Sequence, residues 1–345
     1  KFKIDGYVVP KNDEFFSEYS QIDRLKFISN FTGSAGIAVI LKKKNYIFVD
    51  GRYSIQASIE SGKSFKIIDY KKLRNCKIFK NLTIGIDPKN FTSNQIKKFF
   101  LKNNKIKNID LNLIDSILKK RNFKNKPFYS LDKSIVGEGY LSKIRKVTNF
   151  LKKKNLDYLF VSAPENVAWL LNIRGFDNPN SPIPNCHLLI NKNKNFYLIS
   201  EHRKVRKIIK EKRIFKKQLI ETKDLVNNLI KFKRGKILLD SKSCSLFYQN
   251  LFCKNFKIIK NEDPIYLLKS IKTKKEINFM INSHILDGVA LTKFLYWIKK
   301  INKKEITEIN AQDKLENFRK KNSKYLFPSF NTIAGTGKNA AIVHY

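Results

Sequence analysis

The sequence lacks the local patterns that build most disulfide, zinc and nucleotide sites. Its four cysteines, Cys76, Cys186, Cys244 and Cys253, form no CxxC pair and show no Cys/His spacing typical of zinc. We therefore expect reduced, mostly buried thiols. The stretch AGTGKNAA lacks the first glycine and the final Ser or Thr of a phosphate-binding loop, and FTGSAG lacks the third glycine of a dinucleotide-binding loop. In FTGSAG, we expect Gly33 and Gly36 to permit a tight turn into a strand.

Long apolar runs are also absent. No stretch approaches the roughly 18 apolar residues of a membrane-spanning helix, and nothing before Tyr7 has the pattern of a signal peptide. We therefore expect a soluble, cytoplasmic protein with no membrane partner. Because the first residue is Lys1 rather than Met, we expect the N-terminus to be trimmed.

Acidic residues are scarce. The chain has 70 Lys and Arg residues against 29 Asp and Glu residues, which gives a formal net charge of +41. The lysines are spread along the whole chain, so we interpret them as a solvated surface that attracts polyanions without specificity and in a salt-sensitive way. We expect no specific nucleic-acid partner, although a dedicated polyanion site remains the alternative.

Apolar residues are plentiful enough for buried cores, at 42% of the chain, and the length predicts two or three domains. We predict a first α/β domain over residues 1–130. Strands are expected at 36–41, 46–53, 65–70 and 83–87, and helices at 53–62 and 93–103. Ser93 is the expected N-cap of the second helix.

The second segment, residues 131–263, repeats this plan. An amphipathic helix is expected over 140–155, a buried strand over 158–163, a helix opened by Pro164 at its first position, and a hairpin over 186–200. In both segments a helix, a glycine, a hairpin and a basic end follow one another, and Gly33 and Gly175 are 142 residues apart. This pattern indicates a duplicated domain.

The third segment, residues 264–345, begins with two helices. Thr273 and Glu276 form a capping-box pattern ahead of a long helix whose apolar stripe includes Ile277, Ile281 and Ile285, and Thr307 is the expected cap of the next helix. Short strands are expected over 330–335 and 339–345. These elements are typical of the opening part of a domain rather than of a whole one.

Two residues are candidates for chemistry. His344 ends an apolar stretch just after a glycine-rich turn, where its side chain could face a cleft, and Arg52 lies in the motif VDGRYS at the end of a predicted hairpin. A structural role for Arg52, pairing with a nearby carboxylate, is the alternative at this point. His187, His202 and His284 stand alone, without a second ligand at metal spacing, and are expected in the core or on the surface.

In their order along the chain, the motifs resemble Xaa-Pro aminopeptidase (aminopeptidase P) of the long, three-domain cytosolic type. The resemblance rests on YVVPKNDEFFSEY, FTGSAGIAVI, VDGRYSIQA, ENVAWLLNIRG, IKTKKEINFMINSHILDGVALTKFLYWI, ITEINAQDKLENFR and SFNTIAGTGKNAAIVHY. It implies two related creatinase-type α/β domains followed by the start of a pita-bread catalytic domain of the α+β class.

The resemblance also implies a chemistry. Members of this family remove the N-terminal residue from peptides with proline in second position, using a hydroxide that bridges two divalent metal ions, expected to be manganese. It implies that His344 contacts the substrate near the metals and helps to stabilise the tetrahedral intermediate, and that Arg52 binds the peptide. The family's metal ligands are expected beyond Tyr345, so these 345 residues are expected to bind no catalytic metal pair and to be inactive alone. A homodimer is expected for the complete protein.

Two other functions remain open. A non-catalytic module of the same fold family could bind peptides or proteins, and the positive charge would suit an acidic partner. A different pita-bread hydrolase, such as a prolidase, is less consistent with the duplicated N-terminal domains and with TIAGTGKNAAIVHY.

Overall fold

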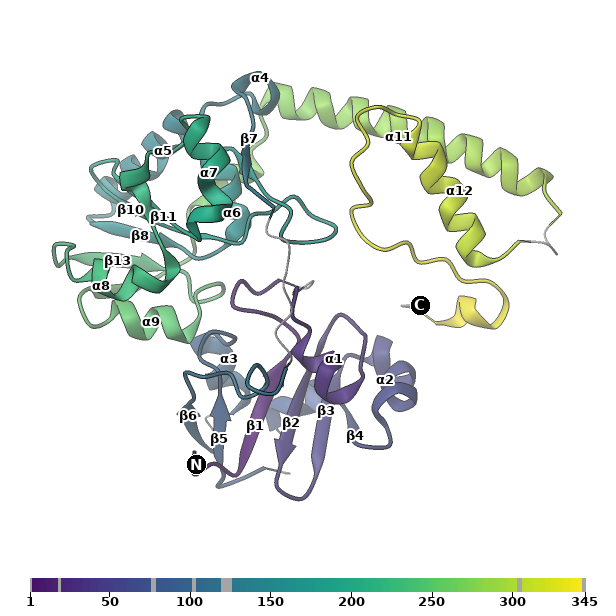
Figure 1. The fold of residues 1–345 in the computed structure, drawn as a ribbon, viewed down its shortest axis with the longest axis horizontal. Coiled ribbons are helices and arrows are strands. Elements are labelled where there is room, and N and C mark those ends of the chain that lie inside the picture. The colour runs from purple at the N-terminus through teal and green to yellow at the C-terminus, as the bar shows by residue number, and fades with distance from the viewer. Residues whose placement is uncertain are drawn as a thin grey trace. The chain divides into compact units, whose positions relative to one another are not determined.

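The computed structural model describes residues 2–17, 20–75, 79–100, 104–118, 126–302 and 306–342. The chain forms two compact units (Figure 1). Unit 1 comprises Lys1–Leu131, Gly139–Asn178 and Pro182–Ser270, and it contains two α/β domains. Unit 2 comprises Asp132–Glu138, Pro179–Ser181 and Ile271–Tyr345, and its described part is built mainly from helices.

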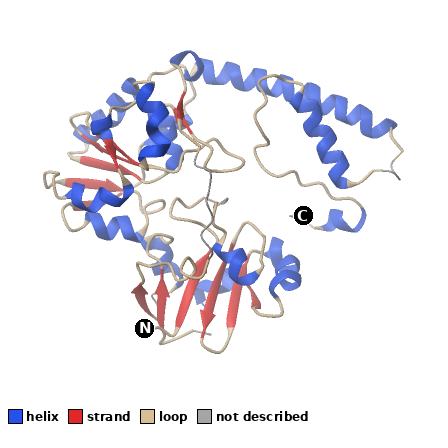
Figure 2. Cartoon of the chain, in the orientation of Figure 1, coloured by secondary structure: helices blue, strands red, loops and turns tan. Residues whose placement is uncertain are grey.

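The first domain of unit 1 is a six-stranded sheet with helices on both faces (Figure 2). Its strands are β1 (Gly6–Pro10), β2 (Gly36–Leu41), β3 (Asn45–Val49), β4 (Lys66–Asp69), β5 (Thr83–Ile86) and β6 (Lys105–Asn108). They lie in the order β4-β3-β2-β1-β5-β6; β2 is antiparallel to β1 and β3, and the other neighbouring pairs are parallel.

The two faces of this sheet form separate cores. The helices α1 (Arg24–Ser29) and α2 (Ser54–Ser61) pack on one face, and α3 (Ser93–Phe99) packs on the other together with the 3₁₀ helix η2 (Tyr70–Asn75). In β1, Val8 enters the core beside α3, whereas Val9 enters the core beside α1. Because both faces are covered, the strands β1, β2 and β3 are nearly continuous apolar runs in the sequence.

The second domain repeats the first, strand for strand. Its sheet has the order β12-β11-β10-β8-β13-β14 with the same pattern of antiparallel and parallel pairs. Its strands are β8 (Tyr158–Val161), β10 (His187–Asn191), β11 (Phe196–Ile199), β12 (Leu219–Ile220), β13 (Lys236–Leu239) and β14 (Lys257–Lys260). The duplication inferred from the sequence is therefore visible in the topology.

Five longer helices and a two-stranded ribbon complete this domain. The helices are α5 (Tyr140–Lys153), α6 (Pro164–Leu171), α7 (His202–Lys210), α9 (Leu246–Phe252) and α10 (Ile265–Ser270), and α8 (Leu225–Leu229) adds a short turn. The ribbon pairs β7 (Tyr129–Ser130) with β9 (Ile173–Arg174). Pro164 occupies the first turn of α6, and β10 and β11 form the predicted hairpin.

The predicted cap of α3 was wrong by one residue. Thr92 is the N-cap: its side chain accepts a hydrogen bond from Gln95 N at 3.2 Å, and its own N donates to Gln95 Oε1 at 2.8 Å. Thr92 has the extended backbone of a cap residue, whereas Ser93 already belongs to the helix. The reciprocal bond from Gln95 makes this a capping box.

Unit 2 contains α4 (Lys133–Val136), α11 (Lys274–Lys300), α12 (Glu308–Lys320) and the 3₁₀ helix η6 (Gly337–Ala341). The capping box of Thr273 and Glu276 begins α11, and Thr307 caps α12, as predicted. The predicted strand over 330–335 was wrong: this segment is a loop, and 337–341 is helical. A strand needs a partner strand, and the described part of unit 2 offers none. Within the described ranges, no helix is long and apolar enough to cross a membrane.

Candidate functional site

Arg52 lies directly after β3, in the 3₁₀ helix η1 (Gly51–Tyr53). Its Nε is 2.9 Å from Asp50 Oδ1, and its backbone N is 3.0 Å from the same oxygen. The two side chains are 46% and 47% exposed, so the pair faces solvent. Hydrogen bonds from the backbone and the side chain of Arg52 lower the pKa of Asp50. Asp50 therefore stays charged at neutral pH, and the carboxylate pairing expected as the structural alternative is present.

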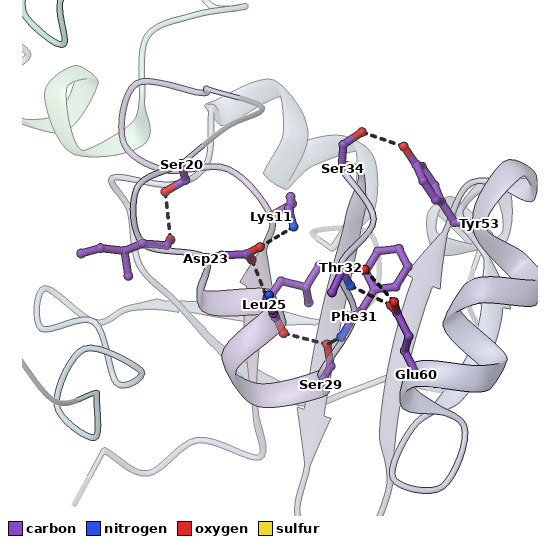
Figure 3. A network of polar contacts seen from close by, with 12 residues as sticks. Lys11, Ser20, Asp23, Leu25, Ser29, Phe31, Thr32, Ser34, Tyr53 and Glu60 are labelled. Atoms are coloured by element: carbon purple, nitrogen blue, oxygen red, sulfur yellow. Dashed lines mark hydrogen bonds and ion pairs between the residues drawn. The ribbon is translucent and has the colours of Figure 1, made fainter. Parts of the chain in front are cut away.

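The backbone around Arg52 is held in place by the next residue, Tyr53. The Tyr53 ring is buried, its hydroxyl lies 2.7 Å from Ser34 Oγ, and its ring meets the Phe31 ring edge to face (Figure 3). The guanidinium carbon of Arg52 is 5.4 Å from the centre of the Tyr53 ring, within the range of a cation–π contact. The Arg52 side chain thus extends into solvent beside the buried Tyr53 ring.

Gly33 allows this packing. A Cβ atom at Gly33 would lie 2.3 Å from the Phe31 ring and 2.8 Å from the Tyr53 ring. Gly33 lies in the bend that leads into β2, as expected, and the position requires glycine also because two rings approach it closely.

Glu60 ties α2 to the loop after α1. Its two carboxylate oxygens accept hydrogen bonds from Thr32 N at 2.7 Å and Thr32 Oγ1 at 2.6 Å (Figure 3). Partial burial opposes the charge, but hydrogen bonds from Thr32 and Gln56 outweigh it and lower the pKa of Glu60. Sequence reasoning missed Ser34, Tyr53 and Glu60, because contacts between separate elements have no local sequence signal.

The glycine-rich turn before His344 is held against the start of α12. Glu308 Oε1 accepts a hydrogen bond from Thr336 N at 2.6 Å, and Asn339 Nδ2 lies 3.2 Å from Glu308 Oε2. Gly337 has φ +54°, a conformation that favours glycine. His344 itself lies outside the described residues, so its role stays a prediction. The strand predicted over 339–345 was wrong at its start, because residues 339–341 belong to the 3₁₀ helix η6.

The described residues do not fit a two-metal centre. Across the described ranges, no group of three or more His, Cys, Asp or Glu side chains could hold a metal ion. His187 is buried and its Nδ1 lies 2.9 Å from Ser162 O, while His202 begins α7 and His284 lies on the exposed surface of α11. No metal-dependent step can be assigned to these residues.

Comparison with protein families divides the chain into three parts. Residues 2–116 and 119–276 each match a "Creatinase/Prolidase N-terminal domain", and residues 278–345 match "Metallopeptidase family M24". The chain is 29% identical to "Xaa-Pro aminopeptidase 1" of Dictyostelium discoideum over 99% of its length and 59% of that relative. It is 31% identical to "Probable Xaa-Pro aminopeptidase P" of Pyrenophora teres, covering 99% of this chain and 57% of that one.

The chain is a homologue of Xaa-Pro aminopeptidase P. A crystal structure of X-prolyl aminopeptidase from Caenorhabditis elegans, described as a cytosolic enzyme with a di-nuclear active site, superposes with a TM-score of 0.89 at 25% identity. The match covers 99% of this chain and 60% of that one. The predicted fold is therefore confirmed: two creatinase N-terminal α/β domains precede a partial M24 domain. This homologue spans about three-fifths of the length of the relatives that it matches.

Proposed function

We propose that the protein containing these residues is a metal-dependent aminopeptidase that releases the N-terminal residue from peptides with proline in second position. The observation that carries the proposal is the continuous match, over 99% of the chain, to an X-prolyl aminopeptidase of known structure. In this proposal two divalent ions, expected to be manganese, are held by residues in the part of the relatives that this chain does not span. The complete protein is proposed to be a cytoplasmic homodimer.

Within that protein we assign residues 1–130 and 131–263 to the two N-terminal domains and 264–345 to the catalytic domain. Arg52 is proposed to bind the peptide substrate. Its exposed guanidinium is supported by the Asp50 pair and the Tyr53 ring, and its charged, planar fork suits carbonyl or carboxylate oxygens. His344 is proposed to contact the substrate beside the metals.

The activity test compares two proteins in manganese-containing buffer. The full-length Dictyostelium relative is expected to release alanine from the tripeptide Ala-Pro-Ala, and the 345-residue chain is expected to release none. Manganese-dependent cleavage by the 345 residues alone would contradict the proposal that the missing part supplies the metal ligands. A full-length protein that binds the tripeptide without cleaving it would instead support the non-catalytic binding module.

The two site residues are tested in the full-length protein that contains this chain. We expect His344→Ala to lower kcat about 100-fold, because one hydrogen-bond donor to a developing oxyanion contributes on that scale. Arg52→Ala is expected to lower kcat/KM about tenfold, since it removes a charge-assisted hydrogen bond to the peptide. Arg145→Ala, on the exposed surface of α5, is the matched control. Unchanged kinetics in either site variant would return that residue to a structural role.

A further inference from the structure

A second candidate site lies at the carboxyl end of the first sheet. The neighbouring parallel strands β1 and β5 lead to helices on opposite faces, because α1 follows β1 on one face and α3 follows β5 on the other. In open α/β sheets, ligands bind in the crevice at such a switch point. The loops after the two strands meet here, and Asn12 Nδ2 donates to Asn90 O at 3.0 Å.

A cavity of about 540 Å³ occupies this position within unit 1. The loops after β1, β5 and β6 line it, and the start of α7 in the second domain lines it as well, together with Asn185. Contacts between the two domains hold these walls together: Ser17 Oγ donates to Asn178 Oδ1 at 2.6 Å, and Gln21 Nε2 donates to Asp177 O at 2.9 Å. The volume suits a small ligand.

Carboxylates dominate the lining, in a chain with a net charge of +41. The acidic residues are Asp13, Glu14, Asp87, Asp110, Asp115 and Glu201. Three of the four basic residues in the lining already have close partners: Arg24 Nε lies 2.7 Å from Asp115, Arg203 Nε 2.5 Å from Glu201, and Lys204 Nζ 2.8 Å from Asp177. Lys89 is the fourth, with its Nζ 3.9 Å from Glu14 Oε2.

Two polar atoms in this lining are buried and have no hydrogen-bond partner among the described residues. One is the side-chain nitrogen of Asn90, a residue that is only 2% exposed. The other is Oε2 of Glu14, which is buried although the Glu14 side chain as a whole is about one-third exposed. A buried polar atom without a partner costs about 1–3 kcal/mol. The pair consists of one donor and one acceptor, so a ligand that satisfies both must carry both kinds of group.

Burial disfavours the charged forms of two acidic groups in the lining. Burial raises the pKa of Asp13 and of Glu14, and the nearby Lys89 only partly offsets this for Glu14. A ligand cation beside them would stabilise their charged forms. A bare metal ion fits less well, because the Asn90 side-chain nitrogen and the Lys89 ammonium, both on residues of the lining, carry hydrogens rather than lone pairs.

We propose that this cleft binds a small molecule carrying an ammonium group next to a carbonyl or carboxylate, which is the chemistry of a free amino acid or of a peptide N-terminus. Glu14 and Asp13 accept hydrogen bonds from the ammonium group. Asn90 Nδ2 and Lys89 donate to the carbonyl or carboxylate oxygen. The proposal does not depend on aminopeptidase activity, since every residue it uses lies in unit 1.

Titration calorimetry on the 345-residue chain tests the proposal with four probes. Glycine and glycylglycine carry both groups, ethylamine carries only the ammonium group, and N-acetylglycine carries only the carboxylate. We expect saturable 1:1 binding of glycine or glycylglycine, and at least tenfold weaker binding of the two single-group probes. Tighter binding of glycine identifies a free amino acid as the source, and tighter binding of glycylglycine identifies a peptide N-terminus.

Three variants locate the binding. Glu14→Gln and Asn90→Leu should each weaken binding at least tenfold, and Asn90→Asp, which replaces the donor by an acceptor, should do the same if Asn90→Leu fails to fold. Glu262→Gln is the matched control, because Glu262 is exposed and lies outside the cavity. The proposal would be overturned if neither glycine nor glycylglycine bound saturably. Equal binding of ethylamine or N-acetylglycine would also overturn it, as would unchanged binding in the Glu14 and Asn90 variants.

Discussion

At the scale of single residues, His187 links burial to a pH dependence. Its ring is buried and stacks on Phe15 with 4.9 Å between ring centres, and its Nδ1 lies 2.9 Å from Ser162 O. Burial lowers its pKa to about 4, from 6.5. The unfolded chain therefore binds a proton between pH 6.5 and 4 that the folded chain does not. Stability is fully present above pH 6.5 and falls as the pH approaches 4, by about 3 kcal/mol from this residue.

The comparison of wild type with His187→Asn isolates this effect. Urea unfolding at pH 7, 5.5 and 4.5 should show the His187→Asn protein losing less stability on acidification than the wild type. Asp263 acts in the opposite direction, because burial raises its pKa to about 6 and its ionisation lowers stability as the pH rises. The contribution of Asp263 is the same in the wild type and in His187→Asn, so it cancels when their stabilities are subtracted. Parallel pH curves for the two proteins would show that His187 does not titrate in this range.

Contacts between residues close together in the sequence could be predicted from the sequence, and contacts between distant residues could not. The pairing of Arg52 with Asp50 joins neighbours in the sequence, so the motif VDGRYS was enough to suggest it. The bond between Thr32 and Glu60 joins the loop after α1 to the helix α2, which only the folded domain brings together. The acidic lining around Glu14 was missed for the same reason. Its one sequence signal is that KNDE and DPKN directly follow β1 and β5, in a chain with few acidic residues.

At the scale of elements, the start of α3 distinguishes two adjacent hydroxyl residues. Thr92 makes the capping box with Gln95, whereas Ser93 Oγ is buried and has no hydrogen-bond partner among the described residues. We expect Thr92→Ala to lower the free energy of unfolding by about 1 kcal/mol, the usual value of an N-cap. Ser93→Ala removes an unsatisfied polar atom, so it should leave stability within about 0.5 kcal/mol or raise it.

Urea unfolding of both variants, followed by far-ultraviolet circular dichroism, measures this contrast. Each variant is the control of the other, because both remove one hydroxyl group at neighbouring positions. A larger loss in Ser93→Ala than in Thr92→Ala would mean that the sequence-based choice of Ser93 as cap was correct after all.

Elements with strong periodicity were predicted well, and elements that depend on neighbours were not. The hairpin of β10 and β11 follows from two apolar runs joined by an Asn/Lys stretch, and the helix α5 follows from an apolar stripe in its own residues. The stretch 330–335 has strand-like composition, yet it forms a loop, because a strand is stable only beside another strand. The same limit explains why the duplication, inferred from element order, could not specify the strand order of either sheet.

At the scale of the whole molecule, α11 differs from the helices of unit 1. Unit 1 buries its apolar residues in cores on both faces of its two sheets. Along α11, by contrast, five residues of the predicted stripe are about half exposed: Ile277, Met280, Ile281, Ile285 and Leu295. Leu286 and Val289, outside the predicted stripe, are about half exposed as well. Ala290 is its one buried residue within the described part of the chain. A helix that is apolar on several sides is normally covered in a folded protein.

Amide hydrogen exchange should therefore separate the two units. In the 345-residue chain we expect α11 to exchange faster than α5, a helix of unit 1 with one buried face, because few contacts oppose its local opening. In a full-length relative, where the remaining M24 residues are present, we expect the corresponding helix to be protected as well as α5. Measurement at two protein concentrations controls for self-association through the apolar surface. Strong protection of α11 in the dilute 345-residue chain would show that this helix is stable without further covering residues, and the proposal that it belongs to a larger catalytic domain would lose its physical support.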